Sequence, residues 1–283
     1  MRRTARIYRL SYRLSAAIIV LLIAGATCAA AQRTGQMPRQ LEGTGIDERL
    51  GEMVPLDPVF ENEDGEAAAL GSFFDGERPV ILALVYHNCP MLCSLVLQGL
   101  TETLGRMEWT PGDQFDVITL SFNPRETPAE AADAKRMYLD MMGRPEAAAG
   151  SHFLTGPDSA IAAVTDAVGF EYRWVEEEQE YAHPSTLIFL SGDGKVSRYL
   201  HGIKYKPSDV KTALVEASEG KVGTAFDQAL LYCFQFDPNA NSYVLHARNL
   251  MKLGGGLTVL LLGSILFMYW RRESHRSWQE AAA

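Results

Sequence analysis

The stretch that decides the fold is VILALVYHNCPMLC, residues 80–93. It opens with Val80–Tyr86, a short apolar run of the kind found in a buried strand. A Cys-x-x-x-Cys pair follows, in which Pro90 comes directly after Cys89. If Cys89 caps a helix, Pro90 occupies the first helical position, where its missing N–H costs nothing. Cys93 then lies one turn further on, so both sulfurs can face one point above the positive end of the helix, which favours thiolates.

Two thiolates one turn apart can close a disulfide or bind a soft metal ion. A purely structural Cys89–Cys93 disulfide is the less favoured interpretation, because a pair four residues apart closes a tiny loop and adds little stability. A redox interpretation makes Cys89 and Cys93 the catalytic pair of a thiol–disulfide oxidoreductase. Their spacing is one residue wider than the usual Cys-x-x-Cys of such enzymes.

Residues 53–220 are expected to form one α/β domain around this site. The further predicted strands are Phe115–Phe122, His152–Leu154, Thr186–Leu190 and Lys195–Leu200, the last two joined by a turn at residues 191–194. The predicted helices are one with Leu92, Val96, Leu100, Leu104 and Met107 at helical spacing, one over Pro128–Met142 with Ala134, Met137, Tyr138 and Met141 on one face, one holding Ile161, Val164 and Val168, and one from Pro207 to Ala217. Strands alternating with helices, then a hairpin and a helix, predict a mixed sheet flanked by helices.

Charge and hydropathy indicate an exported, membrane-bound protein. The 283-residue chain carries a formal net charge of −9, and no dense Lys/Arg face is visible, which excludes a nucleic-acid-binding protein. Residues 1–31 combine a basic head, an apolar run and small residues, which is typical of a signal peptide; an uncleaved anchor is the alternative. Residues 253–270 are uncharged and precede two arginines, which predicts a transmembrane helix with the C-terminus in the cytoplasm.

The remaining segments follow from these two ends. Residues 32–52 read as a polar linker, residues 221–250 as a membrane-proximal extension and residues 271–283 as a cytoplasmic tail. The expected location is the bacterial inner (cytoplasmic) membrane, with a single pass, contact with the lipid bilayer through the C-terminal helix and the main domain on the periplasmic side.

A third soft or borderline ligand would favour metal over plain redox chemistry, and His183 is the candidate. It lies in YAHPST, residues 181–186, immediately before a predicted strand. In a thioredoxin-like sheet, the loop before that strand faces the cysteine helix. Thiolates select Cu(I), imidazole suits both Cu(I) and Cu(II), and first-row affinity is greatest for copper.

The order of these elements resembles the Sco/SenC family, from about Gly51 to Ala217. That family has a thioredoxin fold with a Cys-Pro-x-x-Cys loop and a distant copper-binding histidine. Its usual histidine, strand and Pro-Asp-Gly turn correspond without gaps to residues 183–194. The resemblance implies one copper ion, Cu(I) or Cu(II), bound by Cys89, Cys93 and His183. It also implies a chaperone that assembles the copper centre of cytochrome c oxidase, with an oxidase subunit or another copper-accepting protein as its partner.

The sequence departs from the family pattern around the ligands. Met91 and Ser94 stand where the common loop has Asp and Pro, and no Asp precedes His183. These changes leave the three ligands intact but remove a negative charge near the metal. Pro184 follows His183, at the position where thioredoxins carry their cis-proline, which brings the site nearer to thiol–disulfide chemistry.

Other metal-binding or redox residues receive lesser roles. His87 is interpreted as packing at the strand end rather than as a ligand, and Met91 as a partner-facing apolar residue. Cys233 is interpreted as a buried thiol, His152 and His201 as structural, and His246 and His275 as out of reach of the site. A copper-responsive or redox-sensing module remains a third hypothesis, and the protein is an enzyme only under the oxidoreductase alternative.

Overall fold

The computed structural model describes residues 44–87, 92–177, 179–219, 234–237, 241–245, 255–256, 258–264 and 267–268. The side chains of residues 92, 93, 234–237, 242, 244 and 245 are not described. The chain divides into residues 1–42 and 43–283, and all described residues belong to the second unit. The predicted signal peptide and cytoplasmic tail, Cys89, Met91 and Cys233 therefore lie outside the described residues.

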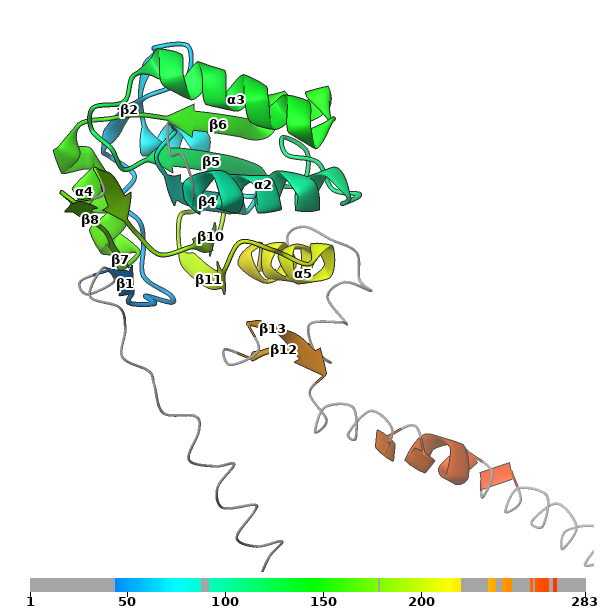
Figure 1. Cartoon of the computed structure of the whole chain (residues 1–283). Coiled ribbons are helices and arrows are strands. Elements are labelled where there is room, and N and C mark those ends of the chain that lie inside the picture. The colour runs from blue at the N-terminus through cyan, green and yellow to red at the C-terminus, as the bar shows by residue number, and fades with distance from the viewer. Residues whose placement is uncertain are drawn as a thin grey trace, which may run out of the picture. The chain divides into compact units, whose positions relative to one another are not determined.

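A five-stranded mixed sheet forms the centre of the domain, in the order β11-β10-β4-β5-β6 (Figure 1). The strands are β4 (Val80–Val85), β5 (Asp116–Ser121), β6 (Ser151–Leu154), β10 (Thr186–Leu190) and β11 (Val196–His201). The first three run parallel, and β10 is antiparallel to both β4 and β11. Every residue of β4, β5 and β10 is buried, as expected for central strands covered on both faces.

Among the described residues, the α-helices that flank the sheet are α2 (Leu92–Gly105), α3 (Pro128–Met142), α4 (Asp158–Ala167) and α5 (Pro207–Ala217). The bounds predicted for α3 and α5 agree with the structure. Thr127 and Glu130 form a capping box that begins α3, and Gly143 ends it in the left-handed conformation, with φ 69°. Together with the alternation of strands and helices, these elements confirm the predicted thioredoxin-like α/β fold.

The apolar face predicted for α3 is only partly buried. Ala131, Ala134 and Tyr138 are buried, whereas Met137 and Met141 are each 48% exposed. The buried positions are spaced by three and four residues, so the contact stripe of α3 is narrow. The two methionines flank this stripe and lie outside it.

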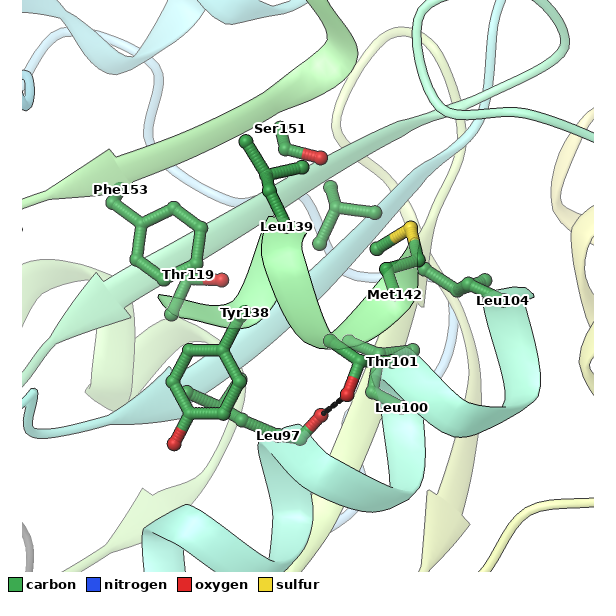
Figure 2. Close-up of a pocket in the computed structure, with 11 residues that line it drawn as sticks. Leu97, Leu100, Thr101, Leu104, Thr119, Tyr138, Leu139, Met142, Ser151 and Phe153 are labelled. Atoms are coloured by element: carbon green, nitrogen blue, oxygen red, sulfur yellow. Dashed lines mark hydrogen bonds between the residues drawn. The ribbon is translucent and has the colours of Figure 1, made fainter. Parts of the chain in front are cut away.

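Helices α2 and α3 cover the same face of β5 and β6, where they enclose a small cavity (Figure 2). Its volume of about 20 Å³ would hold one water molecule. The lining residues are Leu97, Leu100, Thr101, Leu104, Val117, Thr119, Tyr138, Leu139, Met142, Ser151 and Phe153. The cavity is therefore a packing gap between two helices and the sheet, too small for an organic ligand.

Short elements extend the domain at its edges. The remaining strands pair as β1 (Gly45–Ile46) with β7 (Phe170–Glu171), β2 (Val59–Glu61) with β3 (Ala67–Ala69), β8 (Arg173–Val175) with β9 (Glu180–Ala182), and β12 (Phe234–Asp237) with β13 (Ser242–Leu245). Two 3₁₀ helices complete the described elements, η3 (Leu70–Phe73) and η4 (Pro145–Gly150).

The two ends of the domain meet at the edge strand β11. Glu48 accepts a hydrogen bond from the His201 ring at 2.8 Å, and Asn241 Oδ1 accepts the His201 backbone N–H at 2.9 Å. The Gly51 N–H also donates to the Val196 carbonyl, at 2.7 Å. Glu48, Gly51 and Glu52, which lie in the predicted linker, are thus hydrogen-bonded to β11.

The predicted transmembrane helix lies in a region that is described only in part. Residues 255–256, 258–264 and 267–268 are helical, and their large apolar side chains are exposed. Among the described residues, no helix combines the length and the hydropathy that crossing a membrane would need.

Candidate metal centre

The carboxyl end of β4 leads directly into the two cysteines. Tyr86 and His87 follow β4, residues 88–91 are not described, and the described part of α2 starts at Leu92. Cys93 therefore lies in the first described turn of α2, near the helix end where N–H groups lack partners and carry partial positive charge. The expected helix cap at Cys89 and first helical position at Pro90 lie outside the described residues.

His183 lies at the same end of the sheet. It sits between β9 and β10, and β10 is hydrogen-bonded to β4 with Leu187 opposite Ala83. Continued towards its start, β10 runs alongside the residues that follow β4. The ring centroids of Tyr86 and His183 lie 6.3 Å apart. The predicted third ligand is therefore brought beside the segment that enters the cysteine loop.

The His183 imidazole is embedded among aromatic rings. The residue is 4% exposed, and its ring centroid lies 5.2 Å from that of Phe122 and 6.2 Å from that of Phe170. The Nδ1 atom is 2.9 Å from the Pro184 carbonyl oxygen. Because a carbonyl oxygen only accepts, Nδ1 is the donor in this contact. A backbone partner of this kind orients an imidazole for ligation through its other nitrogen.

Pro184 does not adopt the conformation that its position suggested. All peptide bonds of the described residues are trans, and this includes the bond between His183 and Pro184. The parallel with the cis-proline of thioredoxins therefore stops at the position of the proline.

His87 points to the other side of β4, away from β10. Its Nε2 is 3.4 Å from the Leu154 carbonyl oxygen of β6, and its ring lies 5.7 Å from that of Phe153. Burial lowers the pKa of His87, and the nearby Glu126 charge opposes this only in part. The neutral, packed ring matches the structural role that the sequence favoured for it.

Glu126 is a residue of this region that sequence reasoning missed. It is 8% exposed, and its Oε2 accepts the His87 backbone N–H at 2.7 Å and the Ser121 hydroxyl at 2.6 Å. The segment NPRET, residues 123–127, reads as a polar turn before a helix, where an acidic residue is ordinarily solvated. Its position in the connection that follows β5, at the same sheet end as the segment entering the cysteine loop, was the available signal.

The remaining described histidines, His152 and His201, have other partners. His152 lies in β6 with its ring 5.0 Å from Phe73, and burial lowers its pKa. His201 ends β11 and binds Glu48. His246 and His275 lie outside the described residues. Within the described part of the chain, no group of three His, Cys, Asp or Glu residues could hold a metal ion; the two cysteine side chains are not part of that set.

Comparison with known proteins identifies relatives of this domain. A family model described as SCO1/SenC matches residues 59–218, which is more than half of the chain. Among solved structures, a candidate electron transfer protein from Aquifex aeolicus VF5 is 24% identical with a TM-score of 0.53, over 60% of this chain and 94% of that one. A second Aquifex aeolicus VF5 structure, a candidate electron transport protein, is 25% identical with a TM-score of 0.50, over 60% and 98%.

A third solved structure, Bradyrhizobium japonicum ScoI with copper bound, is 21% identical with a TM-score of 0.43, over 56% of this chain and 93% of that one. No curated protein matches the chain.

Proposed function

The chain belongs to the SCO1/SenC family, and on that premise we propose that it binds one copper ion through Cys89, Cys93 and His183 and passes it to a copper-accepting protein, such as a cytochrome c oxidase subunit. The observation that carries the proposal is the pairing of β4 with β10, which brings His183 beside the segment entering the cysteine loop.

The donor set fits copper. Two thiolates and one imidazole are soft and borderline ligands, which select Cu(I) and also accept Cu(II), whereas a structural zinc site would use four protein ligands. Three ligands leave a coordination position that an accepting protein can fill with a ligand of its own. The contact between His183 Nδ1 and the Pro184 carbonyl supports ligation through the other ring nitrogen, Nε2.

A copper titration of the reduced full chain tests this proposal. We expect one Cu(I) per chain, and loss of tight binding in Cys89→Ala and Cys93→Ala. His183→Ala is expected to weaken Cu(I) binding modestly and to abolish Cu(II) binding with its thiolate charge-transfer band, because Cu(II) depends more on the imidazole. His152→Gln changes a half-buried histidine outside the proposed ligand set and should bind copper normally. Full copper stoichiometry in all three ligand variants would refute the site.

A second candidate function is thiol–disulfide exchange by Cys89 and Cys93 without stable metal. It is supported by the position of Cys93 in the first turn of α2, where the helix favours a thiolate. A reductase needs both cysteines but no imidazole ligand. In anaerobic assays run side by side, we expect His183→Ala to impair copper delivery and to leave exchange with a model disulfide within about threefold of normal. Normal delivery by His183→Ala, with exchange lost in Cys89→Ser, would make exchange the leading function.

The proposal includes attachment to the bacterial inner membrane. Residues 1–31 would direct export, residues 253–270 would span the bilayer, and the domain would face the periplasm. Support comes from the uncharged segment before Arg271 and Arg272, and from the exposed apolar residues of its described helical part. A reporter that works only in the cytoplasm, fused after Ala283, should be active. Activity of a reporter that works only outside the cytoplasm would contradict this topology.

A further inference from the structure

We propose that Glu126 is a positioning residue for the copper site: its buried carboxylate holds the backbone of the segment from which the cysteine loop departs. This inference rests on the proposed copper function and names a residue outside the ligand set. Glu126 lies in the connection between β5 and α3. It follows His87 by 39 positions in the sequence.

One carboxylate oxygen joins two strand ends. Oε2 of Glu126 accepts the His87 N–H from the end of β4 and the Ser121 hydroxyl from the end of β5. Both bonds are at the short end of the usual range, 2.7 Å to the His87 nitrogen and 2.6 Å to the Ser121 hydroxyl. The residue is 8% exposed, and burying a carboxylate is unfavourable unless hydrogen bonds compensate it. The position of this carboxylate is therefore tightly determined.

The held amide is close to the first proposed ligand. Cys89 follows His87 by two residues, so its Cα lies within about 7 Å of the His87 Cα at full extension. The β ladder ends just before this point, with the Phe122 N–H donating to the Val85 carbonyl at 2.8 Å. The Glu126 bond extends the fixed part of the backbone by two residues beyond β4. At the other end of the loop, α2 is fixed by its buried residues Val96 and Leu97.

This arrangement supplies what a metal site needs around its ligands. Removing a group that orients a metal ligand typically lowers metal affinity by about 10- to 100-fold. Without Glu126, the backbone at His87 could adopt several orientations, and copper binding would have to select one of them. The expected consequence is weaker Cu(I) binding, with the three ligands unchanged.

The test compares Cu(I) affinity and amide hydrogen exchange in full-length variants. Glu126→Ala removes the acceptor, and we expect Cu(I) affinity to fall by about 10- to 100-fold and residues 86–87 to exchange faster. Glu126→Gln keeps an oxygen that can accept both bonds, so its affinity should stay within about threefold of wild type. Equal losses in the Gln and Ala variants would point to the negative charge instead and would overturn the positioning role.

Glu63→Ala is the matched control. Glu63 is a partly buried carboxylate that also accepts a backbone N–H, that of Phe153 at 3.0 Å, but it lies among β2, α3 and β6. This variant reports destabilisation alone, so its Cu(I) affinity and the exchange of residues 86–87 should remain normal. Should Glu126→Ala not fold, Glu126→Asp replaces it, because the shorter side chain withdraws the carboxylate by about 1.5 Å and should show the same loss.

The two readouts separate this inference from the function on which it rests. If wild type binds no Cu(I), the copper proposal fails, whereas faster exchange at residues 86–87 in Glu126→Ala still tests the positioning of the backbone. If wild type binds Cu(I) and Glu126→Ala matches it in both affinity and exchange, the positioning role is wrong and the copper proposal stands.

Discussion

The amino end of β5 holds a buried acid that should make stability depend on pH. Asp116 has a side chain only 6% exposed, and its carboxylate pairs with the guanidinium of Arg78 at 3.1 Å. Arg78 is shared, because it also binds Asp75 at 2.7 Å. Burial outweighs the attraction of Arg78 and raises the pKa of Asp116 from 3.8 to about 6, and the like charge of Asp75 acts in the same direction.

The sign of the effect follows from the two protonation equilibria. Between pH 4 and 6 the folded chain holds a proton on Asp116 more tightly than the unfolded chain does, so stability falls as pH rises through this window. Above about pH 7 both states are ionised, and the full penalty of burying the charge is present. A pKa raised from 3.8 to about 6 changes the free energy of unfolding by about 3 kcal/mol in total. About 1.4 kcal/mol of this change occurs between pH 7.5 and pH 5.

Asp116→Asn isolates this contribution, because the amide keeps an oxygen for Arg78 and does not titrate. Urea unfolding of both proteins, followed by tryptophan fluorescence, gives the free energy of unfolding at pH 5 and pH 7.5. Burial lowers the pKa values of His87 and His152, which makes stability fall as pH drops below 6.5, but this opposite effect is common to both proteins. The wild-type stability relative to the variant should rise by about 1.4 kcal/mol at pH 5. A difference independent of pH, or one of opposite sign, would refute the raised pKa.

Three further predictions concern packing and hydrogen bonds. The Thr155 hydroxyl is buried without a hydrogen-bond partner among the described residues. Thr155→Val should therefore stabilise the folded protein by about 1 kcal/mol and raise its Tm by about 3 °C in calorimetry. The control Thr103→Val loses a 3.0 Å hydrogen bond to the Tyr205 carbonyl and should destabilise the protein instead. In Gly99→Ala the new Cβ would lie 2.1 Å from the Ile203 carbonyl oxygen. The resulting clash should cost more than the roughly 1 kcal/mol that alanine gains over glycine in a helix, so the variant should be less stable than wild type. A free energy of unfolding equal to or above that of wild type would contradict this contact. Asn241→Ala should speed exchange of the His201 amide, and unchanged protection would show that the β12–β13 hairpin does not hold β11.

The sequence predicted the fold well where the pattern of local elements is unambiguous. The apolar run before the cysteines is typical of a buried strand, which β4 is, and the capping residues of α3 fix its ends. Met137 and Met141 could not be placed in the same way, because the width of a buried helix face depends on the neighbouring helix and sheet. Residues 44–52 are polar and look like a linker, and their hydrogen bonds to β11 arise only once that edge strand exists.

The proposed ligands could likewise be predicted from local sequence, whereas the groups that hold them depend on contacts distant in the sequence. Cysteine and histidine are rare enough that their order along the chain predicted a copper site, and the β4–β10 pairing brings His183 to the expected sheet end. Acidic residues are common, and the chain contains 35 of them, so none identifies itself as Glu126 or Asp116 before folding. Their environment is set by strand ends distant in the sequence: Ser121 and the His87 amide around Glu126, and Arg78 beside Asp116. The proposed ligands could therefore be named from the sequence, whereas the hydrogen bonds around them could not. We propose that those bonds control how tightly the chain holds copper.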